Sequence, residues 1–64
     1  MTPTYEIVFR DLFDAGRALT FPCDVEGRVE LSKLPEPARN NYLFAHKMVG
    51  RQYATPEIRQ KEEN

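Results

Sequence analysis

The shortness of the chain, combined with its single cysteine and single histidine, most constrains what it can fold into. Its 64 residues suffice for one domain, which buries only about 60% of the surface of its unfolded chain. Domains this small often depend on a disulfide, a metal or a second subunit. Cys23 has no partner for an internal disulfide, and Cys23 with His46 cannot supply the four ligands of a structural zinc site. Packing or self-association must therefore stabilise the fold.

The composition is typical of a folded protein. Hydrophobic residues make up 41% of the chain and charged residues 30%, which is too apolar for a disordered chain. No apolar run approaches the ~20 residues that span a bilayer, and the first residues lack the basic and apolar segments of a signal peptide. With a lone cysteine as well, we expect a cytoplasmic protein without a membrane partner.

Two adjacent strands are predicted from the alternation of apolar and polar residues. Residues 5–13 and 17–23 each show the pattern of a strand with one buried face. The connection at residues 14–16 ends in a glycine. This favours a three-residue hairpin loop with Gly16 in the left-handed region.

This loop length predicts the pairing of the two strands. Phe9 is expected to face Phe21, and Ile7 to face Cys23, so that apolar pairs share one side of the sheet. Asp11 then falls on the same apolar side. A β-bulge beside Asp11 would restore the pattern.

A second glycine turn, at residues 24–28, predicts a third strand over residues 28–31. With Gly27 as its third loop residue, the turn pairs Asp24 with Arg28. Pro22 then lies in the central strand, which conflicts with the preference of proline for sheet edges. The core side of the expected sheet holds Tyr5, Ile7, Phe9, Leu19, Phe21, Cys23, Val29 and Leu31.

The apolar face of such a sheet needs a cover, and one helix is predicted to provide it. Residues 35–49 have helical spacing, with both prolines in the first turn and Gly50 as the C-terminal cap. The predicted fold class is α+β. It is a three-stranded antiparallel β-meander packed against one α-helix in the C-terminal half of the chain (ββα). The stripe that would lie on the sheet consists of Ala38, Tyr42, Ala45 and Val49.

The chain after Gly50 carries weaker signals. Residues 51–55 are predicted to form a short fourth strand, which Pro56 would confine to an edge. Residues 1–58 are expected to form the single domain, and residues 59–64 a disordered polar tail.

The only pair that resembles a nucleophile and its base is Cys23 with His46. The expected strand register buries Cys23, and the helical wheel turns His46 outward, so the two should point apart. Cys23 is better explained as a small apolar core residue.

Acidic residues give no complete metal or acid–base pattern. Asp24 and Glu26 match part of a calcium-binding loop, but Lys33 occupies the position of its bidentate glutamate. Asp11 and Asp14 are explained as turn residues. We therefore expect no enzyme activity, no catalytic residues, no metal and no cofactor.

The outer face of the predicted helix combines apolar and basic residues. The candidate interaction face consists of Arg39, Asn40, Leu43, Phe44, Lys47 and Arg51. It favours a small non-enzymatic module that docks a protein partner or a second copy of itself, with apolar anchors and a polar rim. Whether Leu43 is exposed or part of the core is left open.

The alternative is a nucleic-acid-binding accessory protein that uses the same basic helix face. Arginine, asparagine and lysine are suitable for contacts with phosphates and base edges. The net charge of −1 and the absence of a known fingerprint argue against this alternative.

Overall fold

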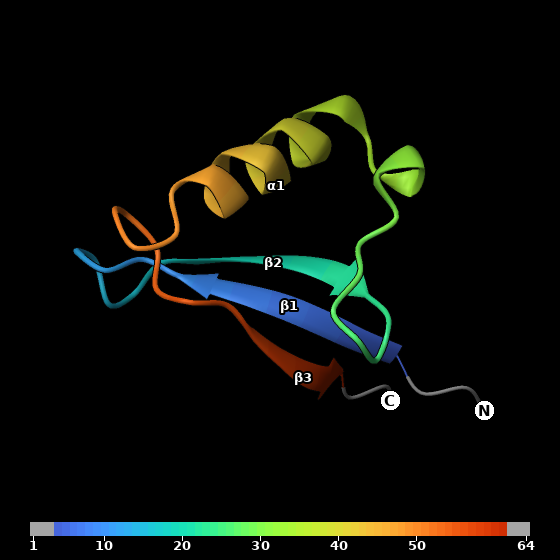
Figure 1. Cartoon of the computed structure of the whole chain (residues 1–64), viewed down its shortest axis with the longest axis horizontal. Coiled ribbons are helices and arrows are strands. Elements are labelled where there is room, and N and C mark those ends of the chain that lie inside the picture. Colours follow the sequence, from blue (N-terminus) through green and yellow to red (C-terminus); the bar gives the residue numbers. More distant parts are fainter. Residues whose placement is uncertain (1–3, 62–64) are drawn as a thin grey trace.

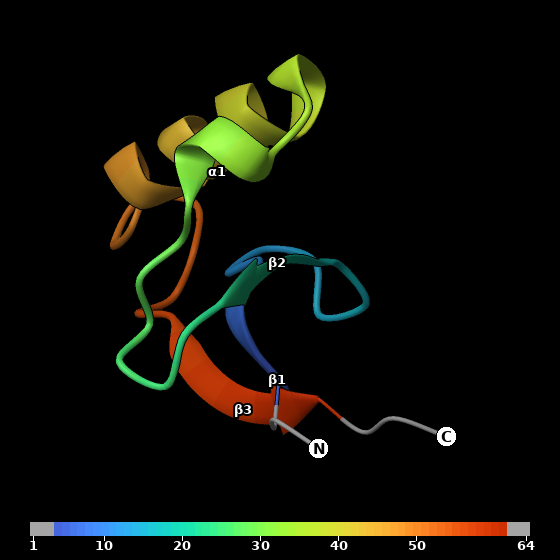
Figure 2. The ribbon, with the colours of Figure 1, turned by 90° about the vertical axis from the view of Figure 1, so that its right-hand side faces the viewer.

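The computed structural model describes residues 4–61, which form one sheet and one α-helix (Figure 1). The strands form an antiparallel sheet in the order β2-β1-β3, and the helix lies across one face of it (Figure 2). The α+β fold class, a three-stranded antiparallel sheet packed on one helix, is confirmed. In chain order the elements are β1 (Thr4–Arg10), β2 (Ala18–Cys23), the 3-10 helix η1 (Leu31–Lys33), α1 (Glu36–Lys47) and β3 (Glu57–Lys61).

The third strand comes from the C-terminal segment, not from the residues after the second turn. Residues 28–30 have no regular structure, although the turn itself is as predicted: Asp24 N donates to Arg28 O, and Gly27 has a φ of 86°. β3 pairs with β1 instead. β1 is therefore the central strand, and β2 is an edge strand.

This strand order removes the conflict at Pro22. Asp11 N donates to Arg17 O at 3.0 Å, so the odd-numbered residues of β2 are those whose backbone bonds to β1. The backbone of Pro22 thus faces away from β1, on the open edge. Its missing N–H interrupts no hydrogen bond there.

The register between β1 and β2 differs from the prediction by two residues. Phe9 lies opposite Leu19, and Ile7 lies opposite Phe21. The predicted partners, Phe21 and Cys23, are therefore wrong. Because side chains alternate with a period of two, the shift leaves the same residues on the core face.

Asp11 causes this shift by closing a longer loop than predicted. Its carboxylate accepts hydrogen bonds from the N–H groups of Phe13 (2.8 Å) and Asp14 (3.0 Å), as in an Asx turn. The connection between the paired residues Asp11 and Arg17 thus spans residues 12–16. Gly16 does not have a positive φ, so the predicted three-residue turn is wrong, and Asp11 needs no bulge.

The segment after the helix runs back along β1. Tyr53 forms an isolated bridge with Asp11, and Ala54 N donates to Arg10 O at 2.9 Å. Residues 51–55 therefore contribute a bridge and not a fourth strand. Residues 59–61, expected in a polar tail, belong to β3, while residues 62–64 lie outside the described part of the chain.

The core lies between the sheet and α1 and is largely aromatic. Phe9 has no exposed surface, and its ring meets those of Phe21, Tyr42 and Tyr53 edge-on at centroid distances of 6.0 to 6.4 Å. Ala45 is also fully buried, which lets the helix approach the sheet closely. Five of the predicted core residues are only half-buried: Tyr5, Leu19, Cys23, Val29 and Leu31.

Val8 is buried on the opposite face of the sheet, where the sequence predicts exposure. It is 1% exposed and lies between Thr20 of β2 and Glu57 of β3. Two ion pairs join β1 to β3 on the same face, Arg10 with Glu57 at 2.8 Å and Glu6 with Arg59 at 3.4 Å. Val8 therefore forms an apolar centre within a polar face.

No helix among residues 4–61 has the length and apolar character to cross a membrane.

Candidate functional site

Five residues of the predicted interaction face are exposed on the outer side of α1 and in the loop that follows, and the sixth, Arg39, is half-buried. We call this set the helix surface: Arg39, Asn40, Leu43, Phe44, Lys47 and Arg51. The helix turns this side outward because Ala45 and the half-buried Tyr42 occupy the side that meets the sheet. Leu43 is 50% exposed, which answers the question left open by the sequence.

Phe44 is anchored at one edge and open at the other. Its ring stands perpendicular to that of Tyr53, with centroids 6.3 Å apart, and the side chain remains 47% exposed. Since Tyr53 is buried and bridged to Asp11, Phe44 rests on a fixed support. The helix surface therefore presents a held aromatic ring beside the exposed Leu43.

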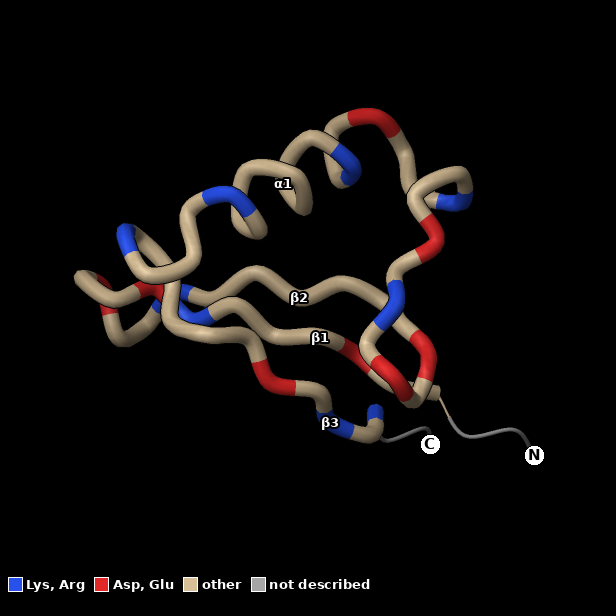
Figure 3. Tube along the Cα trace, in the orientation of Figure 1, with Lys and Arg blue, Asp and Glu red and all other residues tan. Residues whose placement is uncertain are grey.

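The cations of the helix surface have no acidic partners within residues 4–61. Arg39, Lys47 and Arg51 form none of the ion pairs found in this range. Figure 3 shows basic positions along α1 and its following loop, with an acidic position only at the start of the helix. By contrast, ion pairs engage several basic residues elsewhere, namely Arg10, Arg28, Lys33 and Arg59.

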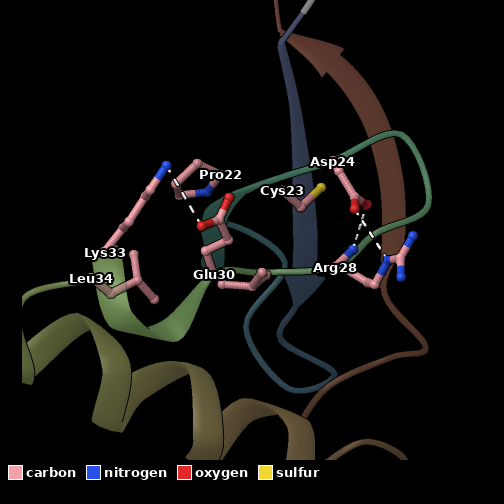
Figure 4. Close-up of a pocket in the computed structure, with 8 residues that line it drawn as sticks. Pro22, Cys23, Asp24, Arg28, Glu30, Lys33 and Leu34 are labelled. Carbon is pink, nitrogen blue, oxygen red and sulfur yellow. Dashed lines mark hydrogen bonds and ion pairs between the residues drawn. The ribbon is translucent and has the colours of Figure 1, made fainter.

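Cys23 lies in an open hollow of about 540 Å³ between the end of β2 and η1 (Figure 4). Burial raises the pKa of its thiol, and the nearby carboxylates of Asp24 and Glu6 raise it further. Ion pairs lie on either side of it, Asp24 with Arg28 at 3.2 Å and Lys33 with Glu30 at 3.6 Å. The hollow is lined by Pro22, Cys23, Asp24, Arg28, Val29, Glu30, Lys33 and Leu34.

The structure does not bring Cys23 and His46 together as a nucleophile and base. His46 is exposed on α1, and its ring lies against that of Tyr42 at a centroid distance of 6.0 Å. Cys23 is instead half-buried at the margin of the core, with its thiol held in the protonated form. A protonated thiol is a poor nucleophile.

In both turns, aspartate side chains accept hydrogen bonds from backbone N–H groups of the same turn. Asp24 accepts hydrogen bonds from the N–H groups of Glu26 (2.9 Å) and Arg28 (2.8 Å), and Arg28 also pairs with the Glu26 carboxylate. Asp14 accepts a bond from Gly16 N. Residues 4–61 contain no group of three or more His, Cys, Asp or Glu side chains that could hold a metal ion.

These turn carboxylates should make the fold less stable in acid. The N–H of Phe13 holds the pKa of Asp11 below its ordinary value of 3.8, and the N–H of Arg28 does the same for Asp24. The stability that the ionised Asp11 and Asp24 give to the fold is therefore fully present above pH 3.8. It is lost as the pH falls through the lowered pKa values of the two carboxyl groups. Urea unfolding should show a lower midpoint at about pH 2.5 than at about pH 6. The difference should shrink in Asp24→Asn, and equal midpoints in the unmodified chain would contradict this account.

Sequence reasoning missed the exposed loop tip at residues 12–16. Leu12 is 50% exposed and Phe13 81%, whereas the sequence predicts both in the first strand, over residues 5–13. Two successive apolar residues break the alternation of a strand, which was the available signal. Leu12 N donates to Gln52 O, so this tip lies beside the loop that follows α1.

Comparisons of the chain with protein-family models, curated proteins and solved structures found no match.

Proposed function

We propose that the protein is a small non-enzymatic interaction module that docks a protein partner through the helix surface. One observation carries the proposal: half-exposed Leu43 and Phe44 lie on the same helix as cations that lack acidic partners in the described chain. Apolar anchors surrounded by polar residues are typical of the energetic centre of a protein interface. The raised pKa of Cys23 argues against this thiol as a nucleophile.

The chemistry of the helix surface favours a particular kind of partner. Leu43 and Phe44 would enter an apolar depression, with Phe44 held in place by Tyr53. Arg39 and Lys47 would meet acidic residues around that depression, which assists encounter and orientation more than final affinity. The partner expected is therefore a protein surface with an apolar pocket and an acidic rim.

Leu43→Asp should abolish this docking while leaving the fold intact. Loss of a central anchor and burial of a new charge should cost at least about 2 kcal/mol, a weakening of about 30-fold or more. The measurement is quantitative affinity capture from host lysate with the unmodified protein and the variant, each checked by circular dichroism. Leu12→Asp is the matched control, because Leu12 is also 50% exposed but lies outside the helix surface.

A protein retained by the unmodified chain and by Leu12→Asp, but lost with Leu43→Asp, would support the proposal. Equal capture by all three would reject the helix surface as the docking site. The capture is repeated after nuclease treatment. Binding that disappears with nuclease and with Arg39→Ala or Lys47→Ala would favour the nucleic-acid alternative instead.

A further inference from the structure

The sheet has two open edges, and they differ in their capacity to accept another strand. The β2 edge carries Pro22, whose missing N–H prevents continuous pairing. The β3 edge, over Glu57–Lys61, contains no proline, and every residue of it is exposed. β3 is therefore the edge better suited to extension by a further strand.

The hydrogen bonds of β1 identify which backbone groups of β3 face outward. Leu12 N bonds to Gln52 O, and Arg10 O accepts from Ala54 N, so the even-numbered residues of β1 bond toward the C-terminal segment. Their partners in β3 are the odd-numbered residues, among them Glu57 and Arg59. The backbone groups between these, at residues 58 and 60, point to the open edge.

Charge decides how two copies of this edge can pair in antiparallel fashion. Placing Arg59 on the two-fold axis opposes two arginines, although it also sets Glu57 against Lys61 on both sides. Placing Glu57 there opposes two glutamates. Moving the axis to Gln60 sets Arg59 against Lys61, again of like charge. Only an axis at Ile58 sets Glu57 of each copy against Arg59 of the other, with no like-charge pair within β3.

The same register joins the backbones and buries apolar surface. Ile58 has its backbone groups on the open edge, so the two Ile58 residues would exchange both N–H···O bonds at the axis. The Ile58 side chain is 44% exposed in the single chain and would contact its counterpart. Charge and apolar contact thus favour one and the same pairing, in which Gln60 of each copy lies opposite Pro56 of the other.

We propose that a second copy of this chain pairs antiparallel along β3 with Ile58 on the two-fold axis, which makes one continuous six-stranded sheet. The side chains needed are already positioned. Glu57 is held by Arg10 and Arg59 by Glu6, yet Glu57 and Arg59 keep 57% and 52% of their side-chain surface exposed. This pairing uses a surface other than the helix surface and does not depend on it.

The test is a charge exchange between two variants. Glu57→Lys alone should place like charges opposite each other twice per dimer, and Arg59→Glu alone should do the same. Each should weaken self-association at least about tenfold in sedimentation velocity. In a mixture of the two, the new lysine faces the new glutamate, and Arg59 of one copy faces Glu57 of the other. The mixture should recover the affinity of the unmodified protein.

Matched controls separate this effect from a change in net charge or folding. Glu36→Lys and Lys33→Glu make the same charge changes away from β3 and should leave self-association unaltered. Circular dichroism checks that every variant is folded. Loss of the exposed pair between Arg10 and Glu57 should cost at most about 1 kcal/mol, whereas Arg59→Glu also removes the cation from Glu6, which is only 17% exposed. Leu43→Asp should also leave the dimer unchanged, so a failure of the helix surface would be distinguishable from a failure at β3.

Two results would overturn the proposal. An unmodified protein that remains monomeric at about 1 mM has no association of useful strength. Variants that weaken association singly but fail to recover it when mixed would show that Glu57 and Arg59 do not face each other across the interface.

Discussion

Replacement of Phe9 by alanine should leave the chain largely unfolded at room temperature. Phe9 has no exposed surface, and its ring touches three others, from β2, α1 and the segment before β3. Truncating a phenylalanine in such a site costs about 3–5 kcal/mol. In a chain of 64 residues, a single core rarely supplies more than about 3–5 kcal/mol of stability, so the loss is comparable to the whole. Urea unfolding followed by far-ultraviolet circular dichroism measures it.

Phe13→Ala is the control for this prediction. Phe13 has the same side chain four residues later, but it is 81% exposed at the loop tip. Its truncation should change stability by no more than about 0.5 kcal/mol. Similar losses for the two variants would mean that Phe9 is not the centre of the core.

The parts of the fold that the sequence predicted are those with a local pattern. Alternation identified β1 and β2, and helical spacing over residues 35–49 contained α1 at Glu36–Lys47. The register error came from a single residue, since Asp11 folds the loop with its own side chain. Such side-chain-directed turns compete with glycine-based turns and do not follow from alternation alone.

β3 could not be predicted because its sequence carries no strand pattern. Four of its five residues are polar or charged, and Ile58 is its only apolar side chain. Its stability comes from pairing with β1, nearly the full length of the chain away. The ion pairs of Arg10 and Arg59 depend on that strand pairing. The sequence therefore could not predict how they differ from the cations of the helix surface, which have no acidic partner within residues 4–61.

The helix surface could be predicted from the sequence, because it depends on a local helical pattern. Once the helix is placed, its wheel puts Leu43 on the outer side, although the sequence alone left its exposure open. The exposed Leu43 agrees with this, but the contact of Phe44 with Tyr53 required the return of the chain after Gly50. Local periodicity thus gave the position of the surface, and long-range contacts gave its support.

Gly27→Ala should destabilise the fold by about 2 kcal/mol or more, because two independent costs meet at this position. The φ of 86° lies in the left-handed region, where a Cβ costs about 1–2 kcal/mol. A Cβ there would also lie 2.6 Å from Cδ1 of Ile58, so this half-exposed side chain would have to leave its rotamer, at a cost of about 0.5–1.5 kcal/mol. Urea unfolding measures the loss.

Gly50→Ala separates the two costs. Gly50 has a φ of 87°, and a Cβ added there would have no neighbour within 4 Å, so only the backbone cost applies. The excess loss in Gly27→Ala then measures the contact with Ile58. Ile58→Val, which removes Cδ1, should reduce that excess when combined with Gly27→Ala, in a double-mutant cycle. If Gly27→Ala and Gly50→Ala lose the same stability and Ile58→Val changes neither, the Ile58 side chain moves aside at no measurable cost, and the backbone conformation alone sets the loss at Gly27.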